Sequence, residues 1–204
     1  MRKKSHILLG RYLADQMSEV YSLQQHRKAF CLGNIMPDLK PSFLTTRHEF
    51  FGTFNQLQSN MRELVERSPE EDNARVYWRR FGEVMHYMAD YFTFPHNRTY
   101  KGSLAEHNSY EAELKNRLKE CILSGRADSQ LEEAKHFDSF EELVEYIRER
   151  HTCYLESPRC IADDIRFILR VCYQVVQGIF QLCMRRQFHM EEQPLMVGDR
   201  KSVV

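Results

Sequence analysis

Apolar residues recur at every third or fourth position along most of the chain, the spacing of one face of an α-helix. One early stripe contains Leu9 and Leu13, and another contains Leu57 and Met61. A broader apolar stripe runs from 161 to 180 and predicts a long helix deep in the core. No stretch alternates convincingly between apolar and polar residues. The pattern therefore predicts an all-α fold, a compact single domain of several helices.

Four serines mark predicted helix starts. Ser68, Ser103 and Ser139 are each followed three residues later by a glutamate, which is the arrangement of a capping box. Ser157 precedes Pro158, and proline is common at the first position of a helix. We therefore expect one helix to begin after each of these serines.

The chain has 204 residues, a length that suits one domain with a substantial core. The predicted helices fall within residues 1–192, which we assign to one helical domain. Residues 193–204 lack a helical pattern, and we expect them to form a flexible tail. The longest irregular stretch is 33–54, and a loop of that length in a compact domain is often functional.

Charge and cysteine content narrow the class of protein. The 29 basic residues balance the 29 acidic ones, so no global positive field attracts nucleic acid or an anionic membrane. The apolar run after Met1 is shorter than a signal peptide needs, and Arg11 interrupts it. None of the six cysteines forms a C-x-x-C pair. We expect a cytoplasmic protein without a transmembrane segment, in at most transient contact with a membrane surface.

Two pairs of ligand-type side chains have helical spacing. His86 and Asp90 are four residues apart on one predicted helix, and His107 and Glu111 are four apart on the next. Residues at that spacing share one face of a helix. A single pair of this kind is more often a surface ion pair. His96 lies between the pairs, and histidine with carboxylate is the ligand mix of catalytic zinc. The grouping favours a metal site between helices.

Three further candidates lie upstream. Asp38 follows Pro37 in a turn, His48 comes ten residues later, and His6 stands at the start of the first predicted helix. Taken singly, each is more often a cap or a surface residue. Four other histidines lack such neighbours and are interpreted as structural or surface residues: His26, His136, His151 and His189.

The order of these residues resembles a known family, the trinuclear-zinc enzymes that include bacterial zinc-dependent phospholipases C and fungal single-strand-specific nucleases. The most specific match is segment 82–96. It contains a glycine, the His-Tyr pair at His86, an aspartate four residues after that histidine, and a histidine six residues after that aspartate. His107 with Glu111 matches the next element. The resemblance spans about residues 6–111, and the family is all-helical.

The resemblance implies eight metal ligands in this chain: His6, Asp38, His48, His86, Asp90, His96, His107 and Glu111. They would hold two or three Zn²⁺ ions. The first ion would take Asp38, His48, His86 and Asp90, the second would take the last three ligands, and His6 with Asp90 would take the third. Close metal ions stabilise both the attacking and the leaving oxygen at phosphorus. Asp38 would also orient or deprotonate the attacking water.

The chain departs from the family pattern in places. Secreted members expose an N-terminal tryptophan whose amine and carbonyl complete the third site, whereas this sequence starts with Met1. Leu39 stands where the phospholipases carry an aromatic residue. A choline cage needs aromatic faces, so choline is not the expected head group. Four phenylalanines fit either an apolar mouth of the site or the core: Phe43, Phe50, Phe51 and Phe54.

These observations predict a metal-dependent, phospholipase C-like hydrolase of phosphate esters that acts through zinc-activated water on a small-molecule or lipid phosphodiester. One alternative is a nuclease on the same scaffold, which the neutral charge and the lack of an aromatic-and-basic run disfavour. Another is a metal-binding protein without turnover. An HD-type phosphohydrolase needs adjacent His-Asp residues, and the chain has none. The sequence predicts no particular oligomeric state.

Overall fold

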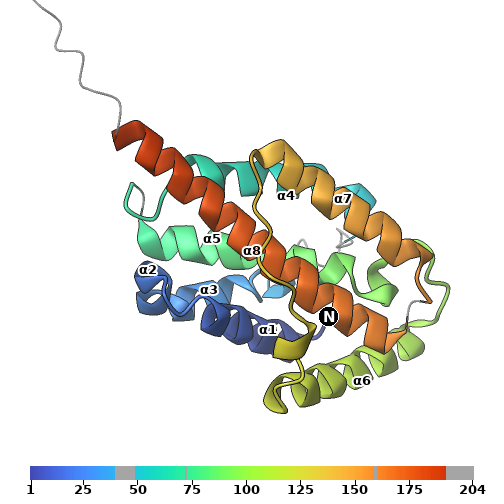
Figure 1. The fold of residues 1–204 in the computed structure, drawn as a ribbon. Helices are drawn as coiled ribbons and strands as arrows, with labels where there is room; N and C mark the ends of the chain where they lie inside the picture. Colours follow the sequence, from blue (N-terminus) through green and yellow to red (C-terminus); the bar gives the residue numbers. More distant parts are fainter. Residues whose placement is uncertain (40–48, 72, 159, 192–204) are drawn as a thin grey trace, which may run out of the picture.

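A computed structural model of the chain describes residues 1–39, 49–71, 73–158 and 160–191 (Figure 1). Within these residues the protein has eight α-helices and no strand, which confirms the predicted all-α fold. The helices are, in order, α1 (Lys3–Gln16), α2 (Tyr21–Gln25), α3 (Arg27–Gly33), α4 (Phe50–Glu66), α5 (Ala74–Tyr91), α6 (Leu104–Leu123), α7 (Phe140–Glu156) and α8 (Ile161–Glu191). Short 3₁₀ turns are η1 (Pro37–Leu39), η3 (Phe94–His96) and η4 (Asp128–Gln130).

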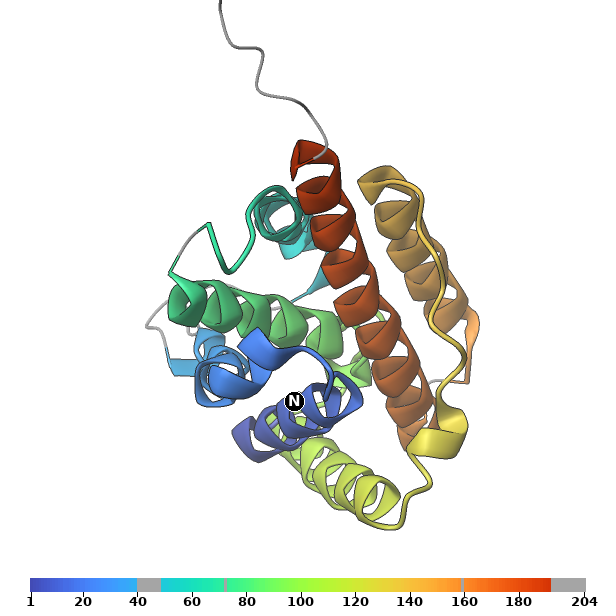
Figure 2. The same cartoon turned by 60° about the vertical axis from the view of Figure 1, so that its left-hand side comes forward.

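Helix α8 is the axis of the molecule. Figures 1 and 2 show it running through the middle, with α7 along one side and α1, α3 and α5 on the other. It packs against five other helices: α1, α4, α5, α6 and α7. Its apolar stripe is buried, with Ile168, Leu169 and Val175 fully enclosed. By length and composition alone, residues 161–189 are apolar enough to cross a membrane, but 61% of the most apolar stretch is buried in the fold. A core helix passes the same test, so this is weak evidence for a membrane span.

Helices α3 and α5 cross at two glycines. A Cβ atom on Gly33 would lie 1.9 Å from the carbonyl oxygen of Arg79, and one on Gly82 would lie 2.1 Å from that of Phe30. Only glycine lets two backbones approach this closely. The crossing places Asn34, at the end of α3, beside His86 on α5. A packing contact between helices thus positions one of the predicted site residues.

The predicted starts of two helices are confirmed. The Ser103 hydroxyl caps α6, and the Glu106 side chain binds back to the Ser103 backbone in a complete capping box. The Ser139 hydroxyl accepts a hydrogen bond from the backbone N–H of Glu142 at the start of α7. The capping residues of both helices could therefore be identified from the sequence.

The other two predicted starts are wrong. Ser68 does exchange hydrogen bonds with Glu71, but these close a turn, and α5 begins at Ala74 with Asn73 as its cap. Ser157 ends α7 instead of opening α8, which begins at Ile161. A serine satisfies backbone groups in an isolated turn as well as at a helix terminus, so the motif alone does not fix a helix start.

The irregular stretch after α3 is shorter than predicted. Phe50 and Phe54 lie on the buried face of α4, in the core, whereas Phe51 on the same helix is 63% exposed. The core interpretation is therefore correct for two of the four phenylalanines. Phe43 and the predicted tail, 193–204, lie outside the described residues.

Candidate metal centre

Side chains from five elements converge beside helix α5. They come from α1, η1, α5, η3 and α6, and they include seven of the eight predicted ligands: His6, Asp38, His86, Asp90, His96, His107 and Glu111. The eighth, His48, lies outside the described residues. Residues that lie far apart in the sequence therefore meet at one place in the fold.

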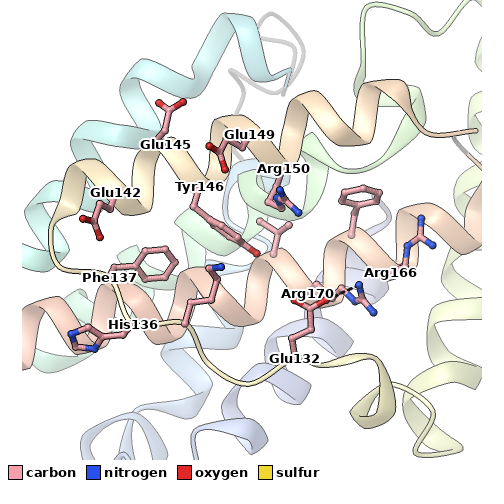
Figure 3. Close-up of a pocket in the computed structure, with 13 residues that line it drawn as sticks. Glu132, His136, Phe137, Glu142, Glu145, Tyr146, Glu149, Arg150, Arg166 and Arg170 are labelled. Atoms are coloured by element: carbon pink, nitrogen blue, oxygen red, sulfur yellow. Dashed lines mark ion pairs between the residues drawn. The ribbon is translucent and has the colours of Figure 1, made fainter.

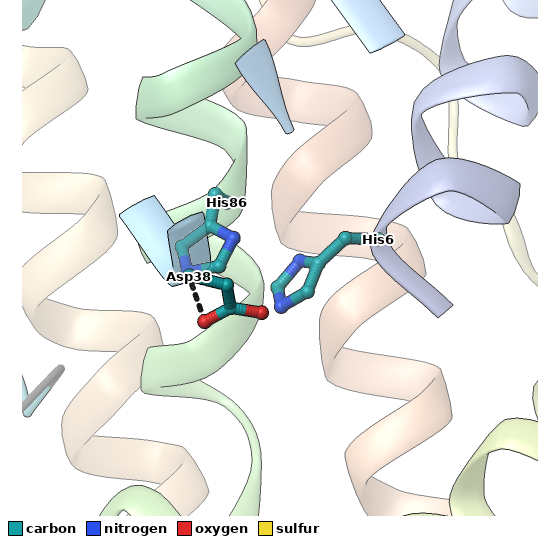
Figure 4. Close-up of side chains that lie close together, drawn as sticks. All are labelled: His6, Asp38 and His86. Carbon is teal, nitrogen blue, oxygen red and sulfur yellow. Dashed lines mark ion pairs between the residues drawn. The ribbon is translucent and has the colours of Figure 1, made fainter. Parts of the chain in front are cut away.

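The first group of ligand atoms belongs to His6, Asp38 and His86, whose nitrogen and oxygen atoms all lie within 4.8 Å of one another. Figure 4 shows these side chains pointing together from three elements. Nε2 of His86 lies 3.7 Å from Oδ1 of Asp38, and the two imidazole rings stack with centroids 3.9 Å apart. Nδ1 of His86 lies 2.8 Å from the carbonyl oxygen of Asn34. When Nδ1 donates its proton to that carbonyl, the lone pair of the ring is on Nε2 and faces His6 and Asp38.

The second group contains His96, His107 and Glu111, again with ligand atoms within 4.8 Å of one another. Oε1 of Glu111 lies 3.1 Å from Nε2 of His96 and 3.2 Å from Nε2 of His107. The His107 side chain is 28% exposed, so this group reaches the surface.

Asp90 lies between the two groups and is fully buried. Its Oδ1 is 3.2 Å from Nε2 of His6, and its Oδ2 is 3.3 Å from Nε2 of His86 and 3.6 Å from Nδ1 of His96. The contact with His6 lacks the angles of a hydrogen bond, and neither ring nitrogen of His6 has a hydrogen-bond partner. A buried imidazole nitrogen without a hydrogen-bond partner is suited to bind a metal cation.

The α-amino group of Met1 is a member of the site that the sequence interpretation missed. Its nitrogen lies 2.5 Å from Oδ1 of Asp90, 3.0 Å from Nε2 of His96 and 3.2 Å from Oε1 of Glu111. Burial lowers the pKa of this amine, but Asp90 and Glu111 outweigh burial and raise it. The resulting ammonium is a cation placed among carboxylates and imidazoles. The resemblance offered a signal for it, because the secreted members use the amine of an N-terminal tryptophan where this sequence has Met1.

Four side chains of the site, His6, His96, Asp90 and Glu111, have pKa values shifted toward the protonation states that metal ligands require. Burial, and then the neighbouring His86, lowers the pKa of His6 to about 3, so its ring is neutral. Burial also lowers the pKa of His96. Burial opposes the ionisation of Asp90, but His96 and the Met1 ammonium hold its pKa well below the usual value. Burial opposes the ionisation of Glu111 as well, but its hydrogen bond with His96 and the Met1 ammonium together lower its pKa.

These features fit zinc. The donors are imidazole nitrogens and carboxylate oxygens, the buried His6 nitrogens are unsatisfied, and an ammonium already supplies positive charge at the centre. The grouping differs in part from the one the resemblance implies. The set of His96, His107 and Glu111 is as expected, whereas His6 joins Asp38 and His86 instead of forming a separate group.

A separate cavity of 530 Å³ lies between α7 and α8 (Figure 3). Tyr146 and Arg150 point toward α8 from its α7 side. Its lining includes none of the predicted site residues, and its four carboxylates match its four lysine and arginine side chains. The cavity therefore offers no net charge to an ionic ligand.

Fold and site together define an all-helical protein with a multi-ligand centre of histidines and carboxylates. Comparison with protein families matches residues 5–161 to the family described as zinc dependent phospholipase C. The chain belongs to this zinc-dependent phospholipase C family. Comparisons with curated proteins and with solved structures gave no match. The matched span contains all eight predicted ligands.

Proposed function

We propose that this protein is a zinc-dependent, phospholipase C-like hydrolase of phosphodiesters, with a lipid or small-molecule substrate. The observation that carries the proposal is the pair of ligand groups joined by Asp90, in a chain of this family. A helical protein without such a function has no physical reason to bury so many ionisable groups together, because burying charge is costly.

The ligand groups suggest how the ions are held. His6, Asp38 and His86 would hold one ion, the second group would hold another, and Asp90 would serve both. The α-amino group of Met1 is the candidate ligand for a third, and it would have to release its proton when the metal binds. Zinc ions held by these ligand groups would act as Lewis acids at phosphate oxygens and would lower the pKa of bound water toward ~7.

The chain's own side chains supply access and proton handling. The first group is buried except for Asp38, whose side chain is 8% exposed, and His107 opens the second group to solvent. The family resemblance gives Asp38 the role of orienting an attacking water and accepting its proton, and the partial exposure of its side chain is compatible with that role. His86 is held by the Asn34 carbonyl, which keeps its Nε2 toward the same place.

An apolar approach to the site supports a lipid substrate over nucleic acid. Leu39 directly follows Asp38 and is 52% exposed. The balanced charge of the chain gives no long-range attraction for a polyanion. A nuclease on the same scaffold and a metal-binding protein without turnover are the outcomes that the test must separate from this proposal.

The test combines metal analysis with hydrolysis by the same preparation. Purified protein should contain two or three zinc ions per chain and should release product from a chromogenic phosphodiester and from phospholipid vesicles. Asp38→Asn should slow hydrolysis by at least ~10²-fold. Glu145→Gln, on the exposed side of α7, is the matched control and should leave the rate unchanged. Zinc-loaded protein that is inert on chromogenic, lipid and nucleotide esters would contradict the enzymatic proposal.

A further inference from the structure

Asp164 is a buried carboxylate that three other elements contact. It lies in the first turn of α8 and is 0% exposed. Its Oδ2 accepts hydrogen bonds from the backbone N–H of Phe94 and the hydroxyl of Tyr110, each at 2.9 Å. Its Oδ1 accepts one from the hydroxyl of Tyr154 at 2.6 Å. Within the described residues no cation forms an ion pair with it, so its charge rests on these donors and on the start of α8.

Two of the donors adjoin the second ligand group. Phe94 opens η3, the 3₁₀ turn that ends at His96. Tyr110 directly precedes Glu111 on α6. A single oxygen atom, Oδ2 of Asp164, therefore binds the backbone two residues before one ligand and the side chain next to the other. The distance between those ligands, Nε2 of His96 to Oε1 of Glu111, is 3.1 Å.

At its start, the turn that carries His96 takes the acceptor for the Phe94 N–H from another element. No side chain caps η3 from within the turn, and the first N–H groups of such a turn lack partners in it. Asp164 supplies the acceptor for the Phe94 N–H, from a helix 70 residues further along the chain. Because η3 is only three residues long, a shift at Phe94 also shifts His96.

Burying the Asp164 carboxylate has a desolvation cost that an apolar residue at this position would avoid. Burial raises the pKa of Asp164 to about 6, although its three hydrogen bonds act in the opposite direction. A buried carboxylate without a cation is a poor way to gain stability. Its position at the junction of η3, α6 and α7 points to a task beyond packing.

We propose that Asp164 is a positioning residue that holds His96 and Glu111 in register and so sets the metal affinity of the second ligand group. The proposal rests on the proposed metal site. Asp164 lies outside the ligand set, on helix α8, which supplies no ligand. Asp164 does not contact the ion itself.

The test compares two tyrosines that donate to the same carboxylate. Tyr110→Phe removes the donor beside Glu111, whereas Tyr154→Phe removes the donor from α7, which carries none of the proposed ligands. Zinc affinity is measured on the full chain by competition with a chromophoric chelator. The second ligand group is identified as the affinity step that His107→Ala abolishes. We expect Tyr110→Phe to weaken that step about 10- to 100-fold, the usual range for an outer-shell partner of a metal ligand.

Tyr154→Phe should leave the same affinity step within about twofold of wild type while lowering the unfolding midpoint as much as Tyr110→Phe does. Asp164→Asn, which keeps an acceptor oxygen, should bind zinc more tightly than Asp164→Leu. Equal effects of the two tyrosine variants on zinc affinity, or no effect of either, would overturn the positioning role while leaving the metal site intact. Wild-type protein that binds no zinc would overturn both proposals. If Asp164→Leu does not fold, the tyrosine pair still decides.

Discussion

The α-amino nitrogen of Met1 lies 2.5 Å from Oδ1 of Asp90, a residue 89 positions further along the chain. Both groups are buried, and they carry opposite charges. The start of the described chain is therefore part of the candidate metal centre, and the length of chain in front of it becomes an experimental variable.

Residues added before Met1 should weaken metal binding. An extension such as Gly-Ser replaces the charged amine with a neutral amide and must pass through a buried cluster. Zinc affinity should fall at least ~10-fold relative to protein whose chain starts at Met1, within the range for a lost metal-site contact. The same extension placed after Val204 is the control and should change nothing. Equal affinities for both extended proteins would show that the amine is not a ligand.

Asp90→Asn should remove zinc from both groups together. The substitution keeps the size of the side chain but halves its acceptors and removes the charge that His6, His86 and His96 share. Metal analysis after dialysis should show a loss of at least one zinc per chain. Glu113→Gln on the exposed side of α6 serves as the control. Full zinc content in Asp90→Asn would refute the bridging position of this carboxylate.

Two buried groups should give opposite pH dependences of stability over almost the same range. Burial lowers the pKa of His151 from 6.5 to about 4. Its contribution is therefore present above pH 6.5 and is lost as the pH falls toward 4. Burial raises the pKa of Asp164 from 3.8 to about 6, so its contribution is present below pH 3.8 and is lost as the pH rises through 6. Each corresponds to about 3 kcal/mol, and the two largely cancel.

Single variants should expose each of these dependences. Between pH 4 and 6.5, metal-free Asp164→Asn should gain stability with rising pH more steeply than wild type, because the His151 contribution is no longer offset. As the pH rises over the same range, His151→Gln should lose stability relative to wild type, because the Asp164 contribution is no longer offset. Urea unfolding at half-unit steps of pH, with chelator present, measures both slopes. Curves parallel to wild type would contradict the assignment.

The glycine crossing of α3 and α5 should not tolerate a methyl group. Gly82→Ala would place Cβ 2.1 Å from the Phe30 carbonyl oxygen, so one backbone must move. We expect a loss of about 1–3 kcal/mol, as for other overpacked sites. Gly52→Ala is the control, because its Cβ would meet only the Glu49 side chain at 3.4 Å in an exposed helix. That variant should gain about 0.5–1 kcal/mol. Thermal unfolding of both variants provides the comparison.

Helical spacing explains why much of the site could be predicted. His86 with Asp90, and His107 with Glu111, lie on α5 and α6, where a spacing of four residues fixes a shared face whatever the tertiary context. The convergence of these pairs with His6 also follows the order expected from the resemblance. These contacts depend on local geometry, which a sequence encodes directly.

The parts that were missed depend on contacts across the fold. The α-amino group of Met1 binds Asp90, which lies 89 positions away in the sequence, and Asp164 binds the backbone of Phe94, which lies 70 positions away. No local sequence pattern predicts either contact. The helix starts predicted at Ser68 and Ser157 are wrong for a related reason. Their local hydrogen bonds are genuine, but α5 begins only at Ala74, with Asn73 as its cap, and α8 begins at Ile161.

The order of the ligands along the chain bears on how the centre is assembled during translation. Every proposed ligand precedes residue 112, whereas α8, which packs against α1, α5 and α6, begins at Ile161. The nascent polypeptide therefore leaves the ribosome with its histidines and carboxylates exposed before the helix that holds them together has been made. Because α8 packs against three helices that carry ligands, we expect the ligands to reach their final positions only after α8 has been made.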